Sequence, residues 1–215
     1  MYVPRHFAGS DPDRMRQLVR AHPLGVLVTL TPDGLDANHI PFLLHDDPAP
    51  HGELHGHIAR ANPLWRDHYG DLQALVIFRG PEHYVSPSWY ASKKESAKVV
   101  PTWNYAVVHA HGRLRIVEDP VWIRAHLEEM TGRQEAKRRD PWALTDAPAD
   151  YIEKMMSAIV GLEIRLTHLV GKFKLSQNRT DRDRDGVVDG LLQEGTESAK
   201  EMARLVREAG KLPPT

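Results

Sequence analysis

Residues 104–118 form the longest segment in which apolar and polar side chains alternate, and this period of two constrains the fold more than any other feature. The apolar positions on one side of such a strand are Val108, Ala110, Leu114 and Ile116, and the polar positions opposite are His109, His111, Arg113 and Arg115. Residues 53–59 and 160–169 repeat the alternation. Strands that alternate in this way bury one face, which is typical of antiparallel sheets.

Shorter elements surround these strands. Further strands are predicted over 25–30, 37–45 and 73–78, with a turn at Pro32-Asp33-Gly34 and a strand end at Gly80-Pro81. Helices are predicted to start at Ser10-Asp11-Pro12-Asp13, and to cover 62–68, 120–132, 149–159 and 196–209. About six strands with only short helices between them predict a mainly β, α+β fold built on a six-stranded antiparallel barrel, not a doubly wound parallel sheet.

Composition excludes several classes of protein. The chain has no cysteine, which excludes disulfides, thiolate metal sites and cysteine nucleophiles. The 28 Lys and Arg residues are balanced by 29 Asp and Glu residues, which argues against a strongly basic nucleic-acid binder. No apolar run reaches membrane-spanning length, and residues 1–7 do not have the pattern of a signal peptide. We therefore expect a cytoplasmic protein with no membrane partner.

Familiar nucleotide, metal and hydrolase motifs are missing or incomplete. No Gly-x-Gly, Walker loop or Gly-x-Ser-x-Gly turn occurs. Residues 181–186 open like a calcium loop, but the twelfth position is Leu192, so a helix start capped by Thr180 or Asp181 is favoured. Two histidine pairs, His55 with His57 and His109 with His111, share strand faces, but no acid joins them at a typical ligand spacing. We predict that they line a polar face, and we predict no metal site.

Three segments instead combine aromatic, amide or hydroxyl, and cationic groups. They are Tyr84–Tyr90, Lys98–Tyr105 and Lys172–Arg179. A flat ring with a phosphate tail requires that mixture of stacking faces, hydrogen-bond donors and positive charge. In the stretch from Ala59 to Pro63, a small residue would admit a ring and Arg60 could contact phosphate. Alternatively, Arg60 pairs with a surface acid and Asn62 caps a helix.

These segments, together with Met1–Phe7, His39–Phe42 and His57–Pro63, resemble the PaiB family of FMN-binding negative transcriptional regulators. The resemblance implies a flavin split barrel with inserted helices over 1–179, a C-terminal helical extension packed on it over 180–215, and a homodimer with FMN near the subunit interface. The cofactor-binding residues it implies are Asn38, His39, Ile40, His57, Ala59, Arg60, Asn62, Lys98, Thr102, Trp103, Lys174 and Gln177.

The biological role that the resemblance implies is negative regulation of transcription, with FMN bound without a covalent link. An FMN-dependent oxidoreductase that takes hydride from NAD(P)H is the alternative, and a split barrel that holds haem through a histidine is a third. No side chain stands out as a catalytic acid or base. No helix-turn-helix with a basic recognition helix is evident, and the basic clusters Lys93-Lys94 and Lys137-Arg138-Arg139 are offset by acids, so promoter DNA has weak support as a partner.

Overall fold

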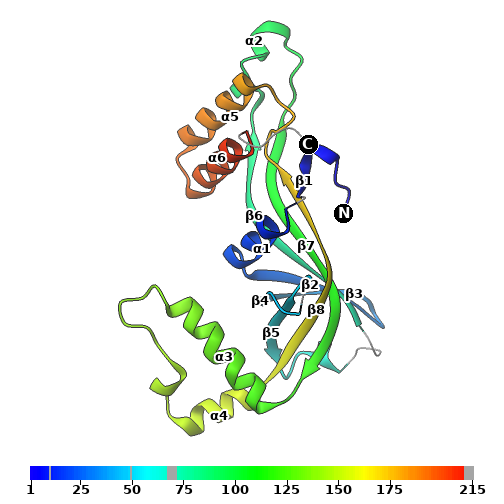
Figure 1. The fold of residues 1–215 in the computed structure, drawn as a ribbon, viewed down its shortest axis with the longest axis vertical. Helices are drawn as coiled ribbons and strands as arrows, with labels where there is room; N and C mark the ends of the chain where they lie inside the picture. The colour runs from blue at the N-terminus through cyan, green and yellow to red at the C-terminus, as the bar shows by residue number, and fades with distance from the viewer. Residues whose placement is uncertain (10, 49, 67–71, 211–215) are drawn as a thin grey trace. The chain divides into compact units, whose positions relative to one another are not determined.

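The computed structural model describes residues 1–9, 11–48, 50–66 and 72–210. It contains two compact units that interleave along the chain (Figure 1). Unit 1 comprises residues 1–21, 79–109 and 170–215, and unit 2 comprises residues 22–78 and 110–169. Three long strands, β6, β7 and β8, contribute residues to both units. Each unit is described by itself below.

The described strands form one eight-stranded sheet in the order β3-β2-β6-β7-β8-β5-β4, with β1 paired to β8. The strands are β1 (Ala8–Gly9), β2 (Leu24–Thr31), β3 (Gly34–Pro41), β4 (Leu43–His45), β5 (Glu53–Ala59), β6 (Leu72–Val85), β7 (Thr102–Val117) and β8 (Ile159–Lys174). The predicted mainly β fold with antiparallel pairing and added helices is confirmed. The described residues form eight strands, not the six predicted, and their hydrogen-bonded order does not close into a ring.

The long strands follow the alternation of the sequence. In β7 the buried positions include Val108, Ala110 and Leu114, as predicted, but Val117 is buried at the end in place of Ile116. β8 continues past the predicted end at residue 169, so Lys172 and Lys174 belong to the same strand. Alternation in the sequence therefore located the strands but underestimated their length.

β6 passes through Gly80-Pro81, where a strand end is predicted, and continues to Val85. Position 81 lies outside residues 75–77, the part of β6 whose register with β2 is described. Proline, which lacks a backbone N–H, is tolerated at such a position. The prediction of a strand end is therefore wrong.

The strand predicted over 37–45 is divided into β3 and β4. Phe42 lies between them, is almost fully buried, and donates its backbone N–H to the carbonyl of Pro23 at 2.9 Å. β3 pairs with β2 and β4 pairs with β5. The turn predicted before β3 is confirmed, with Gly34 at φ +117°, a value that favours glycine.

The two longest helices of unit 1 lie after β8. The helices of unit 1 are η1 (Arg5–Phe7), α1 (Pro12–Ala21), η3 (Pro87–Trp89), α2 (Lys93–Ser96), α5 (Asp181–Glu194) and α6 (Glu197–Ala209). The predicted acidic helix start is confirmed, because the Thr180 hydroxyl accepts the Asp183 N–H at 3.3 Å. Asp11 accepts the Asp13 N–H at the start of α1, whereas Ser10 lies outside the described residues. α5 and α6 lie side by side (Figure 1).

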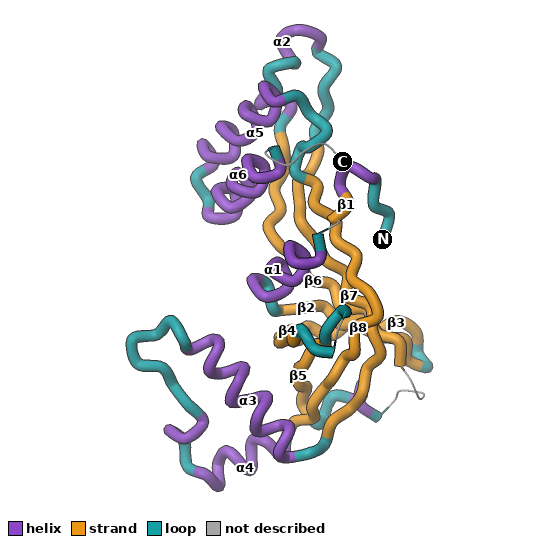
Figure 2. Tube along the Cα trace, in the orientation of Figure 1, coloured by secondary structure: helices purple, strands orange, loops and turns teal. Residues whose placement is uncertain are grey.

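Unit 2 holds a separate helical layer. Its helices are η2 (Pro63–Trp65), α3 (Pro120–Glu135), η4 (Leu144–Asp146) and α4 (Ala149–Ser157) (Figure 2). A small core of Ile123, Leu144, Ile152 and Met156 joins α3 to α4. α3 continues through Gly132 to Glu135, so the end that the sequence predicts at Gly132 is wrong. Residues 67 and 68 of the helix predicted over 62–68 lie outside the described residues. No helix in the described part is long and apolar enough to cross a membrane.

The packing of α3 on the sheet gives a testable consequence. A Cβ atom at Gly161 of β8 would lie 2.4 Å from the Trp122 ring of α3, so Gly161→Ala should destabilise the fold by about 1–3 kcal/mol. Urea unfolding would measure the loss. In the matched control, Gly132→Ala meets no neighbour and should be neutral or stabilise by up to about 1 kcal/mol. Equal effects of the two variants would contradict the packing described here.

Candidate functional site

In unit 1 the end of β8 turns sharply at Ser176. This residue has φ +62°, is buried, and exchanges hydrogen bonds with the Asn104 amide of β7 at 3.0 and 3.3 Å. Gln177 closes the turn, because its side chain accepts the Leu175 N–H at 2.7 Å and donates to the Phe173 carbonyl at 2.5 Å. The Asn104–Ser176 pair thus fixes the positions of the cationic residues on either side of the turn.

Those cations form what we call the cationic corner: Lys172, Lys174 and Arg179, with Thr102 beside them. Lys174 donates a hydrogen bond to the Thr102 hydroxyl. Burial, and then the positive charges of Lys172 and Arg179, lower the pKa of Lys174. None of the three cations has a carboxylate ion-pair partner among the described residues. The corner therefore concentrates positive charge, which the Asp183 carboxylate offsets only in part through its electrostatic interaction with Arg179.

Aromatic rings lie close to these cations. The Lys172 Nζ is 5.3 Å from the centre of the Tyr105 ring, and the Arg179 guanidinium is 4.7 Å from that of Tyr90. Trp103 is 53 % exposed and meets Tyr84 edge to face at 6.1 Å. An exposed indole offers a stacking surface for a flat ring. Lys98 is exposed on the segment between α2 and β7.

In unit 2 the predicted residues lie on β3, on β5 and just after β5. The Asn62 amide donates to Asn38 Oδ1 at 2.7 Å, which links the end of β5 to β3. His39 and Ala59 are exposed, whereas Ile40 is buried in the core. Asn62 also accepts the Leu64 N–H at 2.9 Å and so caps η2. The structure thus brings Asn38 and Asn62 together and places the Ile40 side chain away from solvent.

Arg60 is already engaged within unit 2. It donates to Glu118 at 2.6 Å and to the carbonyls of Ser157 and Ile159 at 3.0 and 3.3 Å, and it lies over the Trp65 ring. This is the arrangement of the alternative interpretation, in which Arg60 pairs with an acid and Asn62 caps a helix. A phosphate would have to displace these partners in order to use the guanidinium.

His57 meets a residue that the sequence did not indicate. Its Nδ1 lies 3.1 Å from Nε2 of His126, a buried residue of α3. Burial and then the neighbouring histidines His57, His55 and His45 lower the pKa of His126 to about 3, and burial lowers that of His57. Both rings are therefore neutral at pH 7, and one N–H is shared between them. The two residues are 69 positions apart, so no local pattern could have paired them.

The structure therefore groups the predicted residues within each unit. In unit 1 it joins Lys174 to Thr102 and places Trp103 at the surface. It adds Lys172, Tyr105 and Arg179 to the set. Lys172 and Lys174 alternate along one strand, and that spacing is the signal by which Lys172 could have been included.

Comparisons with known proteins define the family. A profile for the family described as "Putative FMN-binding domain" matches residues 1–168. A Bacillus subtilis protein named protease synthase and sporulation protein PAI 2, which is PaiB, is 32 % identical over 210 residues, covering 97 % of each chain. The chain belongs to the PaiB family. An uncharacterized protein of Emericella nidulans is 36 % identical over 247 residues and covers 99 % of this chain and 98 % of its own.

Solved structures support the fold of this PaiB-family protein. The FAD and heme binding protein from Mycobacterium smegmatis superposes with a TM-score of 0.58 at 17 % identity, covering 78 % of this chain and 73 % of its own. The PaiB-family chain thus has the fold of split-barrel flavin proteins. The cationic corner lies beyond residue 168 except for Thr102, but it falls within the length that the full-length relatives cover.

Proposed function

We propose that the protein binds FMN without a covalent bond and that the cationic corner of unit 1 holds its phosphate. The observation that carries this proposal is the set of three cations, Lys172, Lys174 and Arg179, which have no carboxylate ion-pair partner in the described part, with aromatic rings against two of them. A doubly charged phosphate relieves their mutual repulsion and accepts several charge-assisted hydrogen bonds. Membership of an FMN-binding family supports flavin as the ring system.

The other predicted residues of unit 1 keep a role in this proposal. Thr102, Lys98 and Gln177 supply hydrogen-bond donors in unit 1, and Trp103 supplies a stacking face. The predicted contacts of unit 2 are Asn38, His39, Ile40, His57, Ala59, Arg60 and Asn62. Among them the Asn38–Asn62 pair is best suited to a flavin, since amides donate to and accept from the ring carbonyls and nitrogens.

A homodimer belongs to the same proposal. Tyr84, Val100 and Trp103 in unit 1 are large apolar residues that remain 42–65 % exposed in a single chain. Clustered exposed aromatic residues favour a ligand or a protein partner. The family resemblance, in which FMN lies near the subunit interface, favours a second copy of this chain and a role in negative regulation of transcription.

The first experiment is to purify the protein in its untreated form and record its absorbance. Flavin bands, release of FMN on denaturation, and a sedimentation mass of twice 24.3 kDa are expected. A haem spectrum, or protein that stays colourless after incubation with FMN, would contradict the flavin proposal. Sequence-selective binding of the protein's own promoter DNA, reduced by salt, would support the regulatory role, and its absence would remove that role alone.

A further inference from the structure

A second group of polar side chains gathers in unit 2 on the face of the sheet that α3 covers. Glu53 and His55 are two residues apart on β5, so both side chains point to the same face. Glu163 of β8 is the direct register partner of His55 and therefore shares that face. Two carboxylates and an imidazole thus converge from two neighbouring strands.

The geometry of this group is compact and shielded. His55 Nε2 lies 2.7 Å from Glu53 Oε1, and one ligand atom from each of the three residues lies within 4.8 Å of the others. Their side chains are only 14–18 % exposed. A transition-metal ion with bonds of about 2.0–2.2 Å separates its ligand atoms by roughly 3–4.4 Å, so small side-chain rotations suffice to enclose one.

We propose that Glu53, His55 and Glu163 bind a divalent transition-metal ion of the Zn²⁺, Mn²⁺ or Fe²⁺ class, with water in the remaining positions. One imidazole nitrogen and two carboxylate oxygens suit these ions, whereas Ca²⁺ takes six to eight oxygens. Binding replaces the hydrogen bond between His55 and Glu53. The metal takes the lone pair at Nε2, and the ring proton moves to Nδ1.

The surroundings hold two of these ligands in place. Arg115 donates to both oxygens of Glu163, at 2.9 and 2.6 Å, and each oxygen keeps a lone pair for a metal. The His55 ring packs against His45 at 4.2 Å and against Trp122 at 5.0 Å. Outer contacts of this kind orient metal ligands in proteins.

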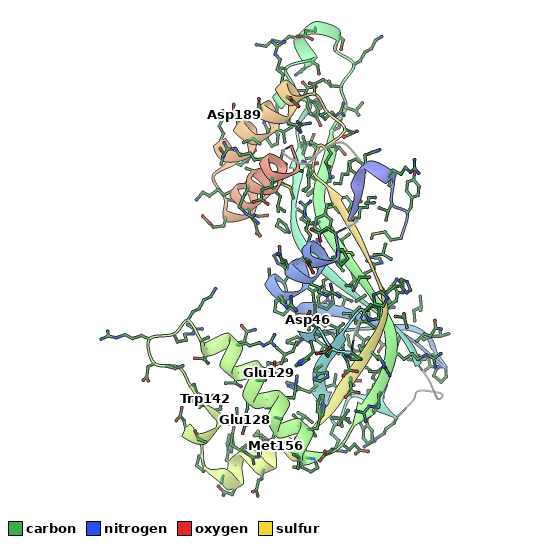
Figure 3. The ribbon with its side chains drawn as sticks, in the orientation of Figure 1. Asp46, Glu128, Glu129, Trp142, Met156 and Asp189 are labelled. Atoms are coloured by element: carbon green, nitrogen blue, oxygen red, sulfur yellow. The ribbon has the colours of Figure 1, made fainter. Side chains whose placement is uncertain are left out.

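A further imidazole is available nearby. Nε2 of His45 is buried and makes no hydrogen bond within the described part, although it lies 3.7 Å from Glu129. Glu129 is labelled on α3 in Figure 3. The sequence predicted no metal site because no acid joins the histidines at the usual spacing along the chain. In the fold, Glu53 lies two residues before His55 on β5, and Glu163 comes from the paired strand β8.

The test uses the full chain stripped of metal with a chelator. Titration with Co²⁺, followed by its visible absorption, and with Zn²⁺, followed by competition with a chromophoric chelator, should saturate at one ion per chain. Glu53→Gln and His55→Gln should each weaken both ions about tenfold or more. The melting temperature should rise with Zn²⁺ in the wild-type protein and not in these variants.

Matched controls are Glu82→Gln and His83→Gln in unit 1, which should bind both ions like the wild-type protein. Wild-type affinity in Glu53→Gln, or equal competition by Ca²⁺, would overturn the proposal, as would no binding at all. Circular dichroism of each variant separates lost ligands from lost folding. The proposed flavin site uses none of Glu53, His55 and Glu163, so the outcome of the metal titration neither supports nor contradicts the flavin proposal.

Discussion

Replacing Lys174 with methionine is expected to weaken FMN binding about tenfold to a hundredfold while leaving riboflavin binding unchanged. Riboflavin has the same ring and lacks the phosphate, so the difference between the two ligands isolates the phosphate contact. The Lys174 ammonium group donates a hydrogen bond to Thr102 and is repelled by the positive charges of Lys172 and Arg179. The phosphate of FMN offsets that repulsion, whereas riboflavin has no phosphate that could do so. Fluorescence titration of each flavin with each protein would measure both affinities.

The control for this variant is Lys200→Met. Lys200 is an exposed lysine of α6 that already pairs with Glu197 at 2.6 Å, so its loss should change neither affinity. The Lys174→Met protein should unfold no more easily than the wild-type protein, because removing one of three clustered cations relieves repulsion. Equal losses for FMN and riboflavin would place the phosphate elsewhere.

Replacing Asp183 with alanine is expected to lower the free energy of unfolding by about 3 kcal/mol, as two charge-assisted hydrogen bonds are lost. Asp183 is only 4 % exposed at the start of α5. Its carboxylate accepts the backbone N–H of Ser92 at 2.9 Å and the Ser92 hydroxyl at 2.8 Å. The variant leaves that N–H without its partner and releases the segment that leads to Lys98. Urea unfolding at neutral pH would measure the loss.

The hydrogen bonds of the Asp183 carboxylate also determine how the stability loss in Asp183→Ala depends on pH. Burial alone would raise the pKa of Asp183, but the hydrogen bonds from Ser92 and Thr180, together with the positive charge of Arg179, outweigh it and lower the pKa below 3.8. A carboxyl group whose pKa is depressed by folding stabilises the protein above its unfolded pKa and loses that contribution as the pH falls through the folded one. The difference between wild type and Asp183→Ala should therefore be constant above about pH 5 and shrink in stronger acid.

Asp189, which is exposed on the same helix, provides the matched control (Figure 3). Asp189→Ala should change the free energy of unfolding by less than about 0.5 kcal/mol. A similar loss of unfolding free energy in both variants would mean that Asp183 stabilises the protein through its charge on the helix and not through its hydrogen bonds with Ser92.

Local patterns predicted the elements of this fold well. Alternation located β5, β7 and β8, and capping residues located the starts of α3, α5 and α6, since both signals depend on neighbours within a few residues. The division of residues 37–45 at Phe42 and the passage of β6 through Pro81 depend on which strand lies alongside. That information is not local, so the strand count and the open sheet order could not be read from the sequence.

The residues of the candidate site show the same difference between local and non-local information. The Gln177 side chain bonds to the backbone of its own segment, at Leu175 and Phe173, so its role depends on neighbours within a few residues. By contrast, Arg60 finds Glu118 across 58 positions, and the pairing of His57 with His126 spans 69. Contacts between residues so far apart in the sequence decide whether a cation or an imidazole is free to bind a ligand. Sequence reasoning could name these residues but could not determine their partners.

The most direct test of the central claim is a comparison of FMN with riboflavin on the wild-type protein freed of bound flavin. If the cationic corner holds the phosphate, FMN should bind at one molecule per chain and at least about tenfold more tightly than riboflavin, and high salt should narrow the difference. Equal affinity for the two flavins, or binding of neither, would contradict the account.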